Sequence, residues 1–359
     1  MFDKIIVQVL DNTMSEIIRL SFDDQKETGL WMDYVYSKKD APVSEMPAWR
    51  RFFKEVYNID SYNYGVLDDN KLIGAVSLYH IKSPLIGNML VSSPFYGHGG
   101  FYADSEYVSK NLLDKIDELS EDLEVDYIEL RLDKSLPGSY KQNTDFLEFD
   151  LKLPSSIDEV WKSCLSSNAR QNIRKSQKSN IRFNSSGDSL NCYKLLSETI
   201  RDLGTPFHHK KYFELLYKHF KDNIYFSEVY LDNRLAAGAI VIHNGYSILT
   251  PLIGSLKIRR NTGVNYFQYW SIIEKCISDG IKRFEFGRSR KGTPHVNFKT
   301  KWGTNTVQLY YNYKTVKKGA RYKSVSNPSP VFVIATIIWK KLPLWFTRSF
   351  GYLFARYIP

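Results

Sequence analysis

The chain of 359 residues is poor in cysteine, and its three cysteines stand far apart at Cys164, Cys192 and Cys276. No two of them form a C-x-x-C pair, and no cysteine and histidine cluster has the spacing of a metal site. These absences exclude a disulfide framework and a zinc motif. We therefore expect reduced, buried thiols and no bound metal.

Long hydrophobic runs are absent as well. The most apolar run, Val331–Trp339, stops at Lys340 and Lys341, whereas a helix needs about 20 apolar residues to span a bilayer. Residues 1–11 contain no apolar run of the length of a secretion signal. We therefore expect a cytoplasmic protein, and the inner face of the membrane is the alternative location.

Acidic residues are missing from the C-terminal fifth of the chain. The formal net charge is +10, yet fourteen lysines and arginines and no acidic residue follow Glu285. The first 285 residues therefore carry a net charge of −4. This asymmetry predicts an anionic partner at the C-terminal end, such as a phosphate-bearing substrate, a nucleic acid or an acidic membrane surface, and a solvated basic face is the alternative.

The length is typical of two domains rather than one, and a diverged internal repeat supports this division. Residues 64–79 (YGVLDDNKLIGAVSLY) and 230–243 (YLDNRLAAGAIVIH) each predict a β-hairpin with an Asp-Asn turn. In both copies a further strand, a turn containing glycine, a helix and a last strand follow. We expect these helices at 105–123 and 264–278, and the last strands at 127–131 and 283–286.

Helices are also expected before each hairpin, at 48–57 in the first copy and at 157–178, 190–203 and 209–220 in the second. Thr205 and Pro206 have the residue types of an N-cap and a first helical position, which would start a helix there. A new strand begins in DFLEFDLKLP, and prolines interrupt the tail. The expected division is 1–145, 146–316 and a basic, aromatic helical tail at 317–359.

One short pattern suits a phosphate group. Arg260-x-x-Gly263-x-Asn265 stands between a predicted strand and a predicted helix, where backbone N–H groups can hold an anion. The pattern is similar to the turn with which the GNAT superfamily holds the pyrophosphate of coenzyme A, although Asn265 replaces the usual small residue. Arg260 and Gly263 are therefore candidate cofactor-binding residues, and an ordinary helix start is the alternative.

Four segments resemble FemAB-related proteins, especially those of bacterial exopolysaccharide and envelope gene clusters. They follow in the same order and cover nearly the whole chain. The segments are LVSSPFYGHGGF at 90–101, SNARQNIRKS at 167–176, LGTPFHHKKYF at 203–213 and FEFGRSRKGTPHVNFKTKWG at 284–303. The resemblance implies an α/β fold of two tandem GNAT-like domains with mixed sheets, and the helical tail follows them here.

The resemblance also implies a reaction. FemAB-type enzymes move an aminoacyl group from aminoacyl-tRNA to a lipid- or nucleotide-linked acceptor, and a Phe-Lys pair lies at the reacting ester. Phe298 and Lys299 match that pair. A fixed cation there would stabilise the oxyanion that forms when an amine attacks an ester or thioester. The donor stays open between aminoacyl-tRNA and acyl-coenzyme A, and no tightly bound cofactor is expected.

Other residues near this pair are candidates for substrate binding. Arg288 is the favoured anion ligand because it comes first after the predicted strand 283–286. Ser289, Lys291, Gly292 and Trp302 are placed with it. This basic segment is expected to be a loop that follows the strand directly.

Two more groups of candidates lie elsewhere in the second copy. Arg170 and Arg174 are four residues apart on the helix expected at 157–178, so they share a face that either bridges an anion or forms a basic surface. His208, Glu285 or His295 could accept the proton of the attacking ammonium group, and solvent is a further alternative.

The first copy has no basic loop after its last strand, where Arg131-Leu132-Asp133 stands. We therefore expect catalysis in the second copy, with the first as scaffold and with Gly99 and Gly100 closing on the acceptor. The tail 331–359 mixes aromatic with basic residues. It suits either an interfacial helix pair on an anionic membrane or packing on the enzyme's own core.

The leading hypothesis is transfer of an acyl or aminoacyl group to an amine of a cell-envelope or polysaccharide precursor. One alternative is an N-acetyltransferase that uses acyl-coenzyme A on an amino sugar or a small amine. Another is a non-catalytic module that binds an anionic glycolipid or nucleic acid. The expected partners are an anionic small-molecule or lipid-linked acceptor and, for an aminoacyl donor, tRNA. The oligomeric state stays open.

Overall fold

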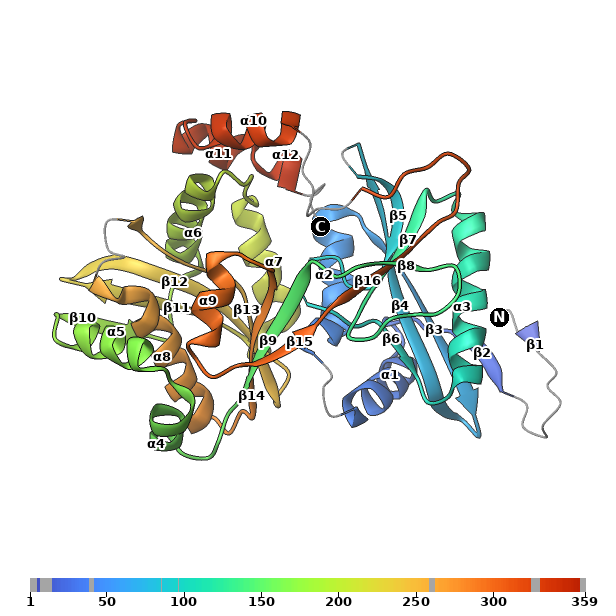
Figure 1. Ribbon diagram of the computed structural model, residues 1–359, viewed down its shortest axis with the longest axis horizontal. Helices are drawn as coiled ribbons and strands as arrows, with labels where there is room; N and C mark the ends of the chain where they lie inside the picture. The colour runs from blue at the N-terminus through green and yellow to red at the C-terminus, as the bar shows by residue number, and fades with distance from the viewer. Residues whose placement is uncertain are drawn as a thin grey trace. The chain divides into compact units, whose positions relative to one another are not determined.

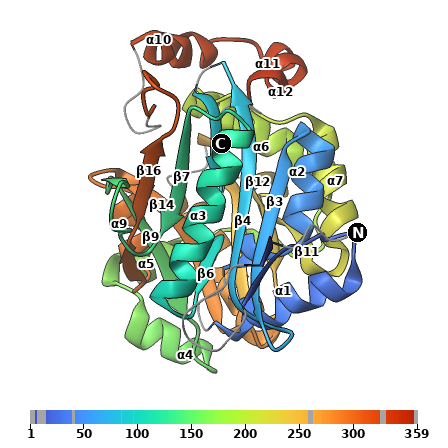
Figure 2. The same ribbon diagram turned by 90° about the vertical axis from the view of Figure 1, so that its right-hand side faces the viewer.

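The computed structural model describes residues 5–6, 15–38, 42–84, 86–95, 97–257, 262–323 and 330–355. The chain divides into two compact units, each built around one mixed sheet (Figures 1 and 2). Unit 1 consists of Met1–Thr144 and Gln308–Ser324, and unit 2 of Asp145–Val307 and Val325–Pro359. The predicted α/β fold with two sheet-containing domains and a helical tail is confirmed.

Unit 1 has a sheet with the strand order β1-β2-β3-β4-β5-β7-β16-β8, and β6 pairs with β4. Its helices are α1 (Gln25–Ser37), α2 (Ala48–Tyr57) and α3 (Glu106–Asp122), and a 3-10 turn covers Val43–Glu45. Its strands are β1 (Ile5–Ile6), β2 (Glu16–Arg19), β3 (Asp60–Asp68), β4 (Lys71–Ser83), β5 (Gly87–Val91), β6 (Phe101–Ala103), β7 (Tyr127–Leu132), β8 (Lys141–Asn143) and β16 (Tyr310–Thr315).

Helical spacing decides which side chains of unit 1 cover the sheet. Val108, Leu112 and Ile116 of α3 form a buried stripe against one face. Trp31 and Val35 of α1 are buried in a second cluster, on the opposite face (Figure 1). The helix predicted at 105–123 is therefore present at its expected place.

Unit 2 has a sheet with the order β10-β11-β12-β13-β14-β9-β15. Its strands are β9 (Phe146–Lys152), β10 (Ile181–Asn184), β11 (Ile224–Leu231), β12 (Arg234–His243), β13 (Ser247–Ser255), β14 (Arg283–Arg290) and β15 (Asn305–Gln308). Its helices are α4 (Ile157–Glu159), a π-helical turn (Val160–Cys164), α5 (Ser167–Gln177), α6 (Ser189–Leu203), α7 (Lys210–Phe220), a 3-10 turn (Lys221–Asn223), α8 (Val264–Ser278), α9 (Pro294–Thr300), α10 (Pro330–Trp339), α11 (Leu344–Phe350) and α12 (Tyr352–Ala355).

The helices of unit 2 also cover both faces of their sheet (Figure 1). On one face, Ile173 of α5 and Ile272 and Ile273 of α8 are buried with Phe284 of β14. On the other face, α6 packs against β12 and β13, and α7 packs against β11. β13 therefore has α6 on one face and α8 on the other, and α9 packs on β14.

Both predicted hairpins are present. β3 and β4 turn at Asp69 and Asn70, and β11 and β12 turn at Asp232 and Asn233, all with positive φ between 46° and 61°. Two successive residues with positive φ define the type I′ turn, whose twist fits a two-residue hairpin and which favours Asp and Asn.

The first predicted boundary, at 145/146, lies within one residue of the division at Thr144 and Asp145, whereas residues 308–324, expected in the second domain and the tail, are placed differently. β16 pairs along β7 from Leu132 to Tyr127, so residues 308–324 belong to unit 1. β16 thereby covers the edge of β7, whose backbone groups would otherwise lack partners. The chain then returns to unit 2 for the tail, where α11 packs on α6.

The single helix predicted at 157–178 was wrong, because the chain breaks it at Leu165 and Ser166. Both residues have extended ψ angles, and the side chain of Ser166 caps α5 by accepting from the N–H of Ala169. Arg170 donates to the carbonyls of Trp161 (3.1 Å) and Leu165 (2.7 Å), which the break leaves without helical partners.

Two further local predictions were wrong. The helix predicted at 209–220 is present as α7, but no helix starts at Thr205 and Pro206, and His209 caps α7 by accepting from the N–H of Lys211. β14 continues to Arg290, because β9 pairs with it along that length, so Arg288 lies in a strand and not in a loop.

Candidate active site

The two central strands of unit 2 separate in the middle of the sheet. β13 pairs in parallel with β14 only from Ser247 to Leu249, opposite Arg283 to Glu285. Beyond that point β13 pairs with β12, and β14 pairs with β9. The facing edges of the two strands then have backbone groups that can bind a ligand, in the way that an exposed sheet edge binds a peptide.

Gly287 lies just past the point of separation. The register of β14 against β9 shifts between Glu285 and Gly287, which marks a bulge. Gly287 has φ +71°, a value that glycine adopts without strain, and a Cβ atom built there would meet nothing within 4 Å. The bulge therefore turns the backbone beside open space.

Lys299 reaches this bulge from α9. Thr293 is the N-cap of α9 and Pro294 occupies its first position, the usual place for proline in a helix. The Nζ atom of Lys299 donates to the carbonyls of Gly287 (2.7 Å) and Arg288 (3.0 Å). These bonds use two of the three N–H donors of the ammonium group.

The Lys299 side chain is buried, with 8% of the residue exposed. Burial lowers the pKa of Lys299 to about 8, with an opposing increase from Glu148 and a further decrease from Arg288. Removing an ammonium group from water disfavours its charged form. At neutral pH Lys299 is therefore mostly protonated, and its charge depends on its neighbours.

Glu148 is the acidic neighbour of Lys299 in this site, and no sequence motif points to it. It lies on β9 directly opposite Arg288 in the antiparallel register, and 5% of it is exposed. The Arg288 guanidinium also lies 5.6 Å from the centre of the Phe146 ring. A single buried glutamate in an alternating strand resembles an ordinary surface residue in the sequence, so its role depends on a pairing that the sequence does not reveal.

Aromatic rings line the side of α9 next to α8. The Phe298 ring lies 5.1 Å from Tyr266 and 5.2 Å from Tyr269, between ring centres, and Trp302 stacks on Tyr266 at 5.9 Å. Burial raises the pKa of Tyr269, so this phenol stays neutral at physiological pH. The buried indole N–H of Trp302 has no hydrogen-bond partner among the described residues.

The other candidates on β14 have different surroundings. Glu285 is buried and accepts from the guanidinium of Arg283 at 3.0 Å, so its carboxylate already holds a charge partner. Ser289 is buried, whereas Lys291 and Gly292 are exposed in the turn before α9.

His208 lies in the segment between α6 and α7, which precedes β14 in the chain by four strands and helices or more. Its ring stacks on Tyr212 with 4.0 Å between centres, and burial lowers its pKa to about 3. A group with so low a pKa is neutral at pH 7 and accepts a proton poorly. His295 is exposed on α9.

Arg170 and Arg174 contact the segment before α5. Arg170 binds the carbonyls of Trp161 and Leu165, and the Arg174 guanidinium lies 5.2 Å from the centre of the Trp161 ring. Both therefore have a local packing role beside any contact with substrate.

Of the two cofactor-binding candidates, Arg260 lies outside the described residues. Gly263 precedes α8 with φ +79°, and a Cβ atom there would lie 2.5 Å from the carbonyl oxygen of Asn172. The close approach of α5 therefore accounts for this glycine.

The candidates of unit 1 lie beside a buried polar network. The N–H of Gly100 donates to Glu45 at 2.5 Å, and the N–H of Gly99 donates to the carbonyl of Arg131 at 2.9 Å. Glu45 also pairs with Arg50 at 2.9 Å. Both glycines have positive φ, and a Cβ on Gly99 would lie 2.2 Å from Glu45, so the network requires glycine there.

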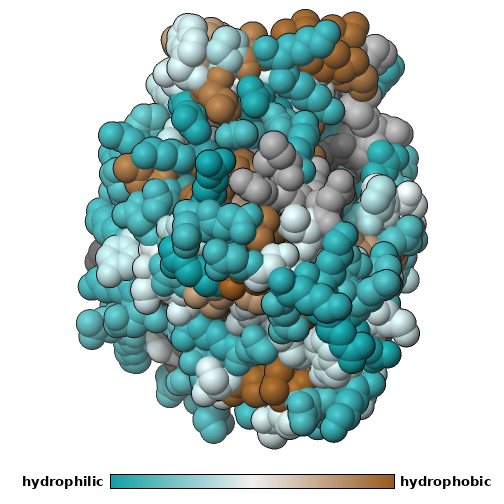
Figure 3. Space-filling model, turned by 90° about the vertical axis from the view of Figure 1, so that its left-hand side faces the viewer, coloured by the Kyte–Doolittle hydropathy of each residue, from teal (hydrophilic) through white to brown (hydrophobic). Residues whose placement is uncertain are grey.

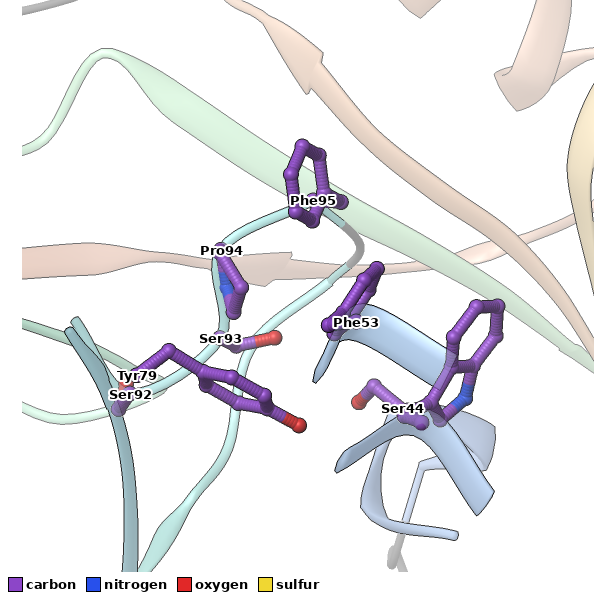
Figure 4. Close-up of a pocket in the computed structure, with 8 residues that line it drawn as sticks. Ser44, Phe53, Tyr79, Ser92, Ser93, Pro94 and Phe95 are labelled. Atoms are coloured by element: carbon purple, nitrogen blue, oxygen red, sulfur yellow. The ribbon is translucent and has the colours of Figure 1, made fainter. Parts of the chain in front are cut away.

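A small pocket opens next to this network (Figure 4). It has room for about one water molecule and is lined by Ser44, Trp49, Phe53, Tyr79, Ser92, Ser93, Pro94 and Phe95. Figure 4 shows the rings of Phe53, Tyr79 and Phe95 around the serine hydroxyls.

Comparison with known proteins identifies the central part of unit 2. Residues 166–300 match the family described as acetyltransferase (GNAT) domain. Unit 2 contains a GNAT acetyltransferase domain. This domain runs from the N-cap of α5 to the end of α9 and therefore includes Lys299.

Solved structures extend the GNAT likeness to most of the chain. FemX is similar with a TM-score of 0.67 and 14% identity, over 84% of this chain and 98% of that one. A tandem GNAT protein from the clavulanic acid biosynthesis pathway has a TM-score of 0.55 and 11% identity, over 83% and 97%. The C-terminal domain of a putative lysylphosphatidylglycerol synthetase from Agrobacterium fabrum has a TM-score of 0.52 and 9% identity, over 87% and 94%.

The fold is therefore the tandem GNAT fold that the FemAB resemblance implied, and residues 166–300 within it are similar to acetyltransferase domains of the GNAT type. A search of curated protein sequences finds no match. Among the described residues, no helix is long and apolar enough to cross a membrane.

Proposed function

We propose that the GNAT domain of unit 2 transfers an acyl or aminoacyl group to an amine of a cell-envelope or polysaccharide precursor, and that Lys299 stabilises the oxyanion. The observation that carries this proposal is the buried Lys299 ammonium, held by two backbone carbonyls beside the separated strands β13 and β14. Such a fixed cation needs no reorganisation when charge develops in the transition state.

The reaction begins when the amine nitrogen of the acceptor attacks the carbonyl carbon of the donor. A C–N bond forms and the carbonyl electron pair moves to oxygen, where the third N–H of Lys299 donates to it. Collapse of this intermediate breaks the C–O bond of an aminoacyl ester or the C–S bond of a thioester. The proton of the attacking amine leaves to solvent, and the leaving group takes up a proton.

Two neighbours support the role of Lys299. Glu148 opposes the effect of burial on the Lys299 pKa, and we assign it the task of keeping the lysine protonated. Phe298 and the rings of Tyr266 and Tyr269 form an apolar side that would pack beside the transferred group and exclude water, which otherwise hydrolyses the donor. Arg288 is the proposed ligand for an anionic group of the substrate.

The donor is aminoacyl-tRNA or acyl-coenzyme A, and separate observations favour each. The likeness of the fold to FemX over most of both chains favours the aminoacyl donor. The match of residues 166–300 to an acetyltransferase domain favours acyl-coenzyme A as a second candidate, with an amino sugar or small amine as acceptor. The turn of unit 1 at Gly99 and Gly100, whose N–H groups bind Arg131 and Glu45, is the proposed contact for part of the acceptor.

The donor can be identified by thermal shift. We expect one of the two donors, or its leaving group alone, to raise the melting temperature of the wild type further as its concentration increases, because ligands that bind only the folded state stabilise it. Coenzyme A, acetyl-coenzyme A and aminoacyl-tRNA should be compared with a salt series. A response to salt and polyanions alone would contradict a donor site.

The acceptor and Lys299 can be tested together by mass spectrometry of envelope glycans. Cells without the protein should lose an acylated or aminoacylated amine, and wild type should restore it. Lys299→Met should restore it at least tenfold more slowly, because an interaction made in the transition state is lost. Lys301→Met, just after α9, is the matched control and should behave as wild type. Full activity of Lys299→Met would remove the assignment.

A further inference from the structure

The tail helices α10 to α12 are fixed to unit 2 along one side. Arg348 of α11 donates to the hydroxyl of Ser197 at 2.8 Å and to the carbonyl of Lys194 at 2.9 Å, both on α6. Arg201 of α6 donates to the carbonyl of Leu342 at 3.1 Å. Thr347 is almost fully buried. The tail is therefore a defined part of unit 2, and packing on its own domain accounts for its inner side.

The outer side of the tail remains apolar and exposed. Nine of the fourteen large apolar residues that are exposed among the described residues lie in the tail. On α10, Val333, Ile334, Ile337 and Ile338 are 45–57% exposed, and their spacing places them on one face of the helix. The others are Trp345 (66%), Phe350, Tyr352, Leu353 and Phe354. Figure 3 shows apolar surface at the top of the molecule, where Figure 1 places these helices.

Basic residues accompany this apolar surface. Lys340 and Lys341 are exposed between α10 and α11, and the sequence contains no acidic residue after Glu285. Large exposed apolar areas on soluble folds mark interaction sites. Basic residues without acidic ones favour an anionic partner, and the apolar face favours a partner that also accepts hydrocarbon.

We propose that the outer face of α10 to α12 docks on an anionic lipid bilayer. Its apolar side chains would enter the boundary between headgroups and acyl chains, and Lys340 and Lys341 would contact lipid phosphates. α10 has ten residues and lies in the interface, since about 20 are needed to cross a bilayer. A second copy of the chain fits less well, because pairing these faces brings their lysines together without an acidic partner.

This surface is separate from Lys299 and does not depend on the proposed reaction. It would hold the enzyme at the membrane surface, where a lipid-linked acceptor would be concentrated. The docking and the reaction can therefore fail independently.

Vesicle flotation with the full chain tests the proposal. Wild type should float with vesicles of mixed phosphatidylcholine and phosphatidylglycerol and much less with phosphatidylcholine alone. The variant Ile334→Ser/Ile338→Ser/Trp345→Ser should bind the mixed vesicles at least tenfold more weakly, because three inserting side chains are lost. Lys340→Glu/Lys341→Glu should lose its preference for the anionic lipid.

The controls separate docking from folding and from self-association. All substituted residues are exposed, so thermal unfolding of the variants should match wild type. Tyr217→Ser removes a side chain of α7 that is 60% exposed and should leave flotation unchanged. Failure of wild type to float with anionic vesicles overturns the proposal. A wild-type dimer that the triple variant converts to a monomer, without vesicle binding, also overturns it and assigns the face to a second copy.

Discussion

The two units place different residues at the same junction between parallel strands. In unit 1, β5 and β7 pair from Met89 to Val91, and in unit 2, β13 and β14 pair from Ser247 to Leu249. A buried glutamate ends the paired stretch of β7 and of β14, Glu129 in unit 1 and Glu285 in unit 2. Two residues later, unit 1 has Arg131 and unit 2 has Gly287.

Arg131 closes the junction in unit 1. Its guanidinium pairs with Glu129 at 2.7 Å and donates to the carbonyls of Ser93 (2.8 Å) and Pro94 on the segment after β5. Gly287 has no side chain to do this, and Lys299 from α9 holds its carbonyl instead. The junction in unit 1 is thus filled and stabilises its own fold, whereas the junction in unit 2 is open and can admit a substrate. This difference supports our proposal that catalysis takes place in unit 2.

The largest effect is expected from opening the filled junction. Arg131→Met leaves the Glu129 carboxylate buried without its cation, and removal of one partner of a buried pair costs about 3–5 kcal/mol in the free energy of unfolding. Urea denaturation should show a loss of this size. The double variant Arg131→Met/Glu129→Gln should recover part of it, because no unpaired charge remains. Equal losses in the single and double variants would show that the arginine acts by packing alone.

The next effect comes from closing the open junction. Gly287→Leu puts a side chain where a Cβ meets nothing within 4 Å, so we expect transfer activity to fall at least tenfold because the substrate space is filled. A leucine with positive φ also costs about 1–2 kcal/mol of stability. Activity should be measured as kcat/KM beside urea denaturation.

Gly280→Leu is the matched control for that change. Gly280 follows α8 with φ +78° and also has nothing within 4 Å of a Cβ atom, so it carries a similar backbone cost away from the site. Its variant should lose stability and keep activity. If both variants keep activity, the space beside Gly287 does not hold the substrate.

Local signals predicted most of the fold. The Asp-Asn turns gave both hairpins, and apolar spacing gave α3 and α8, because turn chemistry and helical stripes act over a few residues. Helix α9 was not predicted, although Pro294 at its first position is a local signal for a helix start. The pairing of β16 with β7 could not be predicted in this way, because its partners, such as Tyr310 and Leu132, lie far apart along the chain.

Residues of the candidate site could be predicted only where they lie together in one segment of the sequence. Lys299 and Arg288 came from a single stretch that resembles a known family. Glu148 reaches them through the register of β9 on β14, and no spacing along the chain encodes that register. The polar network of Arg50 and Glu45 was missed for the same reason, because Glu45 joins Arg50 of α2 to Gly100, which lies far away in the sequence.

The smallest effect is expected from Glu148→Gln, which tests how the open junction controls the charge of Lys299. The Glu148 charge raises the Lys299 pKa, which burial has lowered to about 8, so its removal should move that pKa below about 8. If protonated Lys299 is the active form, activity is present below this pKa and lost above it. The high-pH limb of the rate profile should therefore move to lower pH, with a modest change at the optimum. Glu214→Gln, exposed on α7, should leave the limb in place. An unmoved limb in Glu148→Gln would mean that the carboxylate does not control the lysine, and the open junction would then act through Lys299 and its two carbonyls alone.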